Sequence, residues 1–143
     1  MRKGSRTLRG RLEASEVRQL VVDDGIFTNG LRITFFTVWM QEFDNNEGAF
    51  GLLSLNDTVT SASGAIFPAN DPACVAWAAQ SPMGGNRFAI DTWERLDPDH
   101  IVNEELYIHN RAATPLHYLI VCEPYTMSED EGVLQLVKNK QQS

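Results

Sequence analysis

The sequence predicts an all-β protein, an antiparallel β-sandwich or jelly roll with a basic N-terminal arm and a short C-terminal helix. Three observations favour this class. Short segments rich in Val, Ile, Phe, Trp and Tyr alternate with turn residues along most of the chain. No helical pattern connects one such segment to the next, so the parallel sheet of an α/β fold is not expected. A chain of 143 residues most simply forms one domain with an ordinary core.

We expect three regions, a basic arm over residues 1–16, a β-sandwich over 17–126, and a helix with a tail over 127–143. Residues 1–11 hold five cations and no acid, whereas the net charge of the whole chain is −7. A basic segment on an acidic body predicts contact with an acidic surface, and the body of a second copy offers one. The arm residues expected to bind a partner are Arg2, Lys3, Arg6, Arg9 and Arg11.

Turn signals and alternation predict the first strands of the sandwich. Residues 17–22 are predicted to form a strand that ends at an Asp-Gly turn, and Asn29-Gly30 marks a second turn. Residues 31–43 form the longest predicted strand. Its apolar series shifts by one position between Phe35 and Phe36, which predicts a β-bulge or burial of both faces.

The rest of the sandwich is predicted to contain shorter strands and long loops. Residues 105–123 have the clearest hairpin pattern, two strands joined by a loop at 111–115, with the second strand apolar on both faces. Asp97-Pro98-Asp99 predicts a turn in which Asp97 bonds local backbone amides. The other predicted strands cover residues 50–55, 65–67, 73–79 and 87–90, and residues 93–102 contain the turn before the strand that follows.

The end of the chain has the pattern of an amphipathic helix. Ser128 and Glu131 have capping-box spacing, acidic residues open the segment and lysines close it. Three apolar residues fall on one face, which we expect to bind a partner, and they are Val133, Leu134 and Val137.

The histidines, cysteines and carboxylates do not predict catalysis. The spacing of His100, His109 and His117 matches no zinc signature. A predicted hairpin would allow His109 and His117 to face one another, so a cluster of the three histidines stays an alternative. Cys74 and Cys122 lie in apolar runs, so buried free thiols are expected, with a single disulfide as the alternative. We therefore predict no enzyme activity, no metal and no cofactor.

Other classes of partner are judged from charge and hydropathy. No apolar run reaches the roughly 20 residues that span a bilayer, so no membrane contact is predicted. The cations of the arm are suited to non-specific contact with nucleic acid, an alternative to contact with protein. Exposed tryptophans would favour a sugar-binding surface, whereas buried ones would belong to the core or an interface.

Several blocks together resemble small proteins encoded by marine bacteriophages and environmental viral genomes. They are Leu20-Val-Val-Asp-Asp-Gly25, Thr28-Asn-Gly-Leu-Arg-Ile33, Val75-Ala-Trp-Ala78, Leu96-Asp-Pro-Asp-His-Ile-Val102, Leu106-Tyr-Ile108 and Val133-Leu-Gln-Leu-Val-Lys138.

The resemblance implies a non-enzymatic virion protein of capsid or decoration type, made in the host cytoplasm and associated with copies of itself and other virion proteins. The alternative is a carbohydrate- or receptor-binding module of a phage tail or spike, which would use Trp93 or the loops 56–72 and 81–86.

Overall fold

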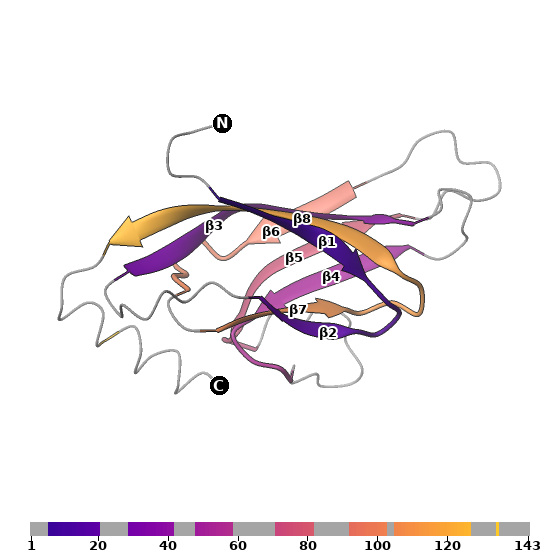
Figure 1. Cartoon of the computed structure of the whole chain (residues 1–143), viewed down its shortest axis with the longest axis horizontal. Coiled ribbons are helices and arrows are strands. Elements are labelled where there is room, and N and C mark those ends of the chain that lie inside the picture. The colour runs from indigo at the N-terminus through magenta and orange to yellow at the C-terminus, as the bar shows by residue number, and fades with distance from the viewer. Residues whose placement is uncertain are drawn as a thin grey trace.

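A computed structural model of the chain describes residues 6–20, 29–41, 48–58, 71–81, 92–102, 105–126 and 134. Between residues 6 and 126, the regular secondary structure of these ranges is β-strand, arranged in two antiparallel sheets (Figure 1). The predicted all-β class is confirmed. No helix in the described ranges is long and apolar enough to cross a membrane.

The two sheets contain three and five strands. The strands are β1 (Arg6–Leu12), β2 (Val17–Leu20), β3 (Asn29–Met40), β4 (Ala49–Ser54), β5 (Cys74–Gln80), β6 (Thr92–Leu96), β7 (Leu106–Asn110) and β8 (Leu116–Thr126). The three-stranded sheet has the order β1-β8-β3, and the five-stranded sheet has the order β2-β7-β4-β5-β6. Figure 1 shows the first sheet lying above β2, β7 and β4 of the second.

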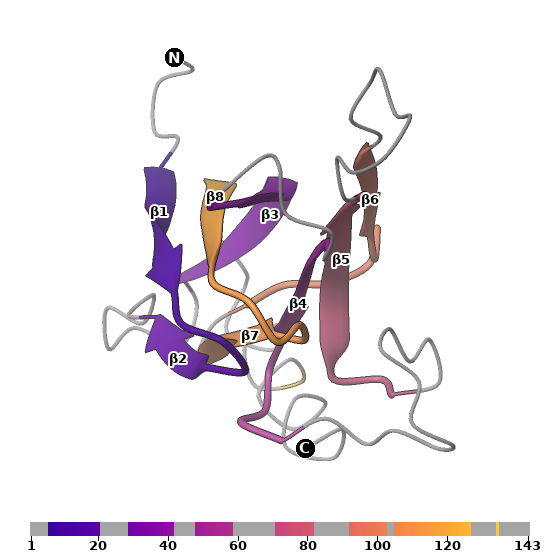
Figure 2. The same ribbon diagram turned by 90° about the vertical axis from the view of Figure 1, so that its right-hand side faces the viewer.

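Strand pairing follows a nested pattern along the chain. The first strand pairs with the last, β2 pairs with β7, and β4 pairs with β5. Between β3 and β6 the contact is made by side chains, because the Thr37 hydroxyl donates a hydrogen bond of 3.1 Å to the Glu94 carboxylate. Three further pairs, β3 with β8, β4 with β7 and β5 with β6, complete the two sheets (Figure 2).

The core lies between the two sheets and takes alternate residues from both. On β3, the buried residues Phe36, Val38 and Met40 point inward. They pack closely on β4, where Gly51 has no side chain: a Cβ added there would lie 2.5 Å from Val38 Cγ1. Only glycine fits at this close approach between the sheets.

The longest strand contains the predicted irregularity. The register of β3 against β8 shifts between Ile33 and Phe35, so Thr34 is the extra residue of a β-bulge. Ile33 and Phe36 are buried, whereas Thr34 and Phe35 are exposed. The shift of the apolar series in the sequence is therefore explained by the bulge.

The segment 105–123 forms two strands, but the predicted hairpin is wrong. β7 belongs to the five-stranded sheet and β8 to the three-stranded sheet, so the loop 111–115 crosses between sheets. Buried Asn110 fixes this corner: its amide donates to the carbonyls of Glu13 and Thr114 at 2.9 and 2.8 Å, and its oxygen accepts from the Ala112 N–H.

The predicted arm requires a correction. Residues 6–12 do not extend freely, because they form β1 and pair with β8 along their whole length. Leu8, Gly10 and Leu12 share the inner side of the sheet, and Leu12 is fully buried. Uncharged residues at alternate positions on the inner side are typical of a half-buried strand, although three of the other positions are arginines. Residues 1–5 lie outside the described residues.

Other predicted elements are confirmed in part or lie beyond the described ranges. The strands predicted at 17–22, 50–55 and 73–79 correspond to β2, β4 and β5. The strands predicted at 65–67 and 87–90 lie outside the described residues. So does the helix predicted within 127–143, except for Leu134, whose side chain is 69% exposed.

Candidate functional site: the outer face of the three-stranded sheet

The predicted partner-binding residues divide into a described and an undescribed group. Arg9 and Arg11 lie on the outer face of the three-stranded sheet, and Arg6 starts β1 on the opposite side of the strand. Leu134 is exposed. Four others lie outside the described residues, and they are Arg2, Lys3, Val133 and Val137.

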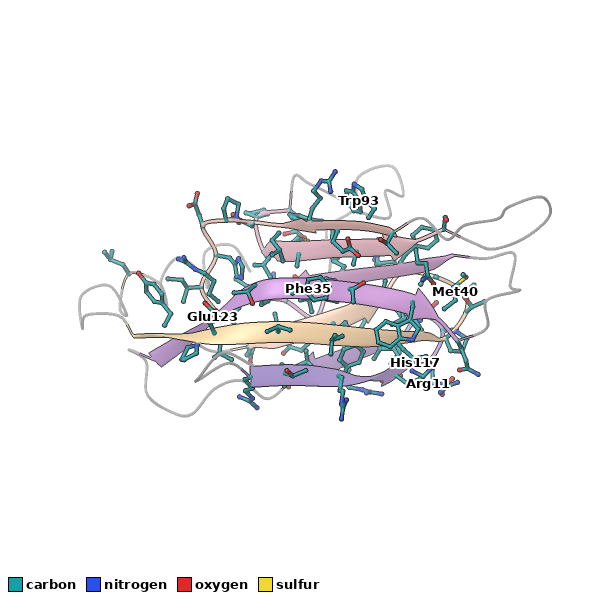
Figure 3. The ribbon with its side chains drawn as sticks, turned by 90° about the horizontal axis from the view of Figure 1, so that it is seen from above. Arg11, Phe35, Met40, Trp93, His117 and Glu123 are labelled. Carbon is teal, nitrogen blue, oxygen red and sulfur yellow. The ribbon has the colours of Figure 1, made fainter. Side chains whose placement is uncertain are left out.

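The outer face of the three-stranded sheet is built from aligned rows of side chains. Cross-strand register places Thr7 beside Val121 on β8, and Phe35 of β3 on the other side of Val121. The next row contains Arg9, Leu119 and Thr37. Figure 3 looks onto this face and shows Phe35 near its middle. Phe35 is 44% exposed, and among the described residues Val17, Trp93 and Leu134 are other large hydrophobic side chains that are exposed.

One end of this face is a stacked aromatic pair beside an arginine. The rings of Trp39 and His117 are stacked, with centroids 5.8 Å apart and planes 16° apart. Arg11 lies beside His117 in the register, donates to the Gln41 side chain at 2.6 Å and forms an ion pair with Glu13. The arginine is held by its neighbours on the protein surface (Figure 3).

Charges of opposite sign lie at the two ends of the middle row. Arg9 is exposed at the β1 end, and no described residue forms a hydrogen bond or ion pair with its side chain. At the other end, Glu94 of β6 accepts the Thr37 hydrogen bond. Leu119 and Thr37 lie between the two charges. The apolar centre of the face is therefore bounded by a cation on one side and a carboxylate on the other.

The three histidines do not come together. His100 is buried beside the edge of β3, where its Nε2 accepts a hydrogen bond from the Ile33 N–H at 2.9 Å. Its Nδ1 therefore carries the proton and donates to the Asp97 carbonyl. Burial lowers the pKa of His100, opposed by Asp97 and aided by nearby Arg32. The ring is a neutral structural bridge.

The other two histidines lie on different sheets. His109 is buried in β7, and its Nε2 donates to the Asn56 carbonyl at 3.0 Å. Burial also lowers the pKa of His109. His117 lies on the outer face of the other sheet, so the facing arrangement expected from a hairpin is wrong. Among the described residues, no three His, Cys, Asp or Glu side chains are grouped closely enough to hold a metal ion.

The thiols and the aspartate pair serve the fold. Cys74 and Cys122 are free and buried. Burial raises the pKa of Cys74 to about 12 and that of Cys122 to about 11, so both stay protonated at neutral pH. Asp97 accepts from the backbone N–H of Asp99 at 2.9 Å, as the predicted turn requires.

Sequence reasoning missed the apolar centre of this face. Phe35, Leu119 and Val121 were read as parts of strands with buried faces, and only the bulge at Thr34 turns Phe35 outward. The one-residue shift of the apolar series could have indicated this face, because it places one large apolar residue, Phe35, on the outer side of a half-buried strand.

A scan of protein-family models, a search of curated proteins and a search of solved structures each gave no match to this chain.

Proposed function

We propose that this chain is a non-enzymatic structural protein of a bacteriophage virion, of capsid or decoration type, that assembles with copies of itself. The observation that carries the proposal is the outer face of the three-stranded sheet, with Phe35 exposed on β3 and with charges of opposite sign at the two ends of the neighbouring row. An exposed apolar area with a charged rim is typical of a protein–protein contact.

The strand order supports a jelly roll as the fold. A jelly roll arises when a long antiparallel ribbon, in which the first strand pairs with the last and each inner pair nests within it, rolls up into two sheets. The pairs β1 with β8, β2 with β7 and β4 with β5 follow this order. β6 departs from this order, because it pairs with β5 and contacts β3 through the hydrogen bond of Thr37 with Glu94. Jelly rolls build viral capsids, and also lectins and cupins, so the fold alone is consistent with several functions.

The state of the reactive side chains also supports a structural role. The rings of His100 and His109 bond to backbone groups, and both thiols are held protonated by burial. The two imidazole rings hold backbone groups in place, and neither thiol is a thiolate at neutral pH. The family resemblance of the sequence points the same way.

Light scattering of the full chain at several salt concentrations tests this proposal. We expect a defined oligomer of the 16.0 kDa chain whose mass decreases as salt rises, because charge contacts between copies are screened. A monomer under all conditions contradicts the proposal.

Deleting residues 1–5 tests the remaining arm cations Arg2 and Lys3, whereas a deletion through residue 11 would also remove β1 from the sheet.

A second candidate function is favoured by Trp93. This side chain is 39% exposed on β6, and the Arg95 guanidinium stacks over its ring at 5.1 Å from the centroid. Exposed tryptophan is a common surface for sugars, so a carbohydrate- or receptor-binding module of a phage tail is the alternative. Binding on a glycan array that is lost in Trp93→Ala would favour it, and an array without signal would remove it.

A further inference from the structure

We propose that a second copy of this chain packs on the outer face of the three-stranded sheet, about a twofold axis that runs parallel to β8, with Arg9 of each copy facing Glu94 of the other. This inference rests on the proposed function and names the surface through which the copies associate. It differs from association through a flexible arm or a terminal helix.

The edges of the three-stranded sheet are poor places for a second copy. The outer edge of β3 is covered, because Leu31 exchanges two backbone hydrogen bonds with Val102, of 2.7 and 2.8 Å. Farther along the same strand, the Ile33 N–H donates to His100 and the Met40 N–H donates to Gln80. These groups are no longer open to pairing with another strand.

The opposite edge is protected by charge. β1 is the other outer strand of this sheet, and three of its seven residues are arginines. Like charges on an edge strand disfavour its pairing with an identical strand. The face of the sheet is left as the surface through which two copies can pack.

The pattern of the face is self-complementary. A twofold axis along β8 lies within the interface, so it keeps each position along the strands and exchanges the two sides of the sheet. The β1 side of one copy then faces the β3 side of the other. In the middle row, Arg9 of each copy lies opposite Thr37 of the other copy, beside the Glu94 carboxylate that Thr37 bonds, and Leu119 meets its own equivalent near the axis.

The neighbouring rows are compatible with the same packing. In one, exposed Phe35 faces Thr7 of the second copy and Val121 faces its equivalent. In the other, Trp39 faces Arg11 of the second copy, a pairing that favours cation–π attraction. In the row near the end of β8, Glu123 of each copy lies near its own equivalent, and Arg32 lies beside each of these carboxylates in the register.

The area of the face indicates how strongly two copies are expected to associate. Three strands about 4.8 Å apart, with β8 rising about 3.3 Å for each of its residues, give a face of roughly 500 Å². Two such faces bury about 1,000 Å², the lower bound for a specific interface. We therefore expect a reversible dimer in dilute solution. Larger closed assemblies are expected only where the same contact is repeated by symmetry between many copies.

Charge reversal in the full chain tests the pairing. Sedimentation velocity over a concentration series gives the dimer Kd of the wild type, Arg9→Glu, Glu94→Arg and the double variant. Each single reversal places like charges opposite one another twice, so we expect the Kd to rise by about tenfold or more. The double variant restores opposite charges and should return within about threefold of the wild type.

Control variants separate the face from general effects of charge. Arg95→Glu makes the same change in net charge from an exposed position of the five-stranded sheet, and its Kd should stay at the wild-type value. Thr37→Val removes the hydrogen bond to Glu94 without changing charge, and should weaken the dimer less than Glu94→Arg does. Thermal melting of each variant checks that the fold is kept.

The outcomes distinguish this inference from the proposed function. Single reversals that leave the Kd unchanged, or a double variant weaker than both singles, overturn the face-to-face contact while the protein still assembles. A wild type that is monomeric at all concentrations overturns both. Recovery in the double variant supports the contact of Arg9 with Glu94 directly, since a misfolded single variant would not be rescued by a second distant charge.

Discussion

The imidazole of His100 accepts the backbone hydrogen bond of Ile33 where another strand would otherwise pair. An N–H can only donate, so the Nε2 of His100 is unprotonated and the ring is neutral. The Nδ1 proton goes to the Asp97 carbonyl, which ties the turn at residues 97–99 to the edge of β3. The histidine thus blocks an edge and connects β6 to the other sheet. Protonation would break this bridge.

We expect the free energy of unfolding to fall as the pH drops below about 6.5. The pKa of His100 and that of His109 are lowered by burial, so the unfolded chain binds protons in this window that the folded chain does not. Each histidine contributes a slope of up to about 1.4 kcal/mol per pH unit. Urea unfolding from pH 8 to pH 5 measures it.

The matching variant is His100→Gln/His109→Gln, in which a side-chain oxygen remains as an acceptor for Ile33 and an amide N–H as a donor for Asn56. We expect its stability to vary less between pH 6.5 and 5 than that of the wild type. An equal slope in the two proteins would assign the pH dependence to other groups.

Gly51→Ala tests the close approach of the two sheets. The added methyl group would lie 2.5 Å from Val38 Cγ1 and 3.1 Å from Phe36 Cζ, so the Val38 side chain or the strand that carries it has to shift. We expect a loss of about 1–3 kcal/mol, measured by urea unfolding. In Gly51→Ala/Val38→Ala the space vacated by Val38 should accept the methyl group, so the combined loss should be smaller than the sum of the two. Strict additivity would contradict the contact.

The buried thiols should react only when the protein opens. Cys74 and Cys122 have raised pKa values of about 12 and about 11, so neither is a thiolate at pH 8. We expect labelling by a disulfide reagent to be slow in buffer and complete in denaturing urea. Above pH 9 the unfolded thiols ionise while the folded ones do not, so stability should fall as the pH rises. Rapid labelling of the native protein would show that a thiol is accessible.

The local elements of this fold were largely predictable, whereas its strand partners were not. Alternation located β3, β4 and β5, and the shift at Phe35 indicated the bulge. Asp97-Pro98-Asp99 predicted its turn. Each of these depends on residues close together in the sequence, which is why a pattern could find them.

Pairing between distant strands has no local signature. Residues 105–123 resemble a hairpin, yet β7 and β8 pair with strands from the other end of the chain, and the corner is set by buried Asn110. The same limit applies to the site. Arg9 was predicted to belong to the basic arm, and nothing local to it predicted that Leu119 and Thr37 would connect it in one row to Glu94.

Light scattering of three full-length proteins at one high concentration tests the central claim, that the chain assembles through the outer face of the three-stranded sheet. Phe35→Asp and Val17→Asp place the same charge at two side chains that are each 44% exposed, one on this face and one on β2. We predict that the wild type and Val17→Asp have a mass near twice 16.0 kDa, and that Phe35→Asp is close to 16.0 kDa. Equal masses for the three proteins would contradict the claim.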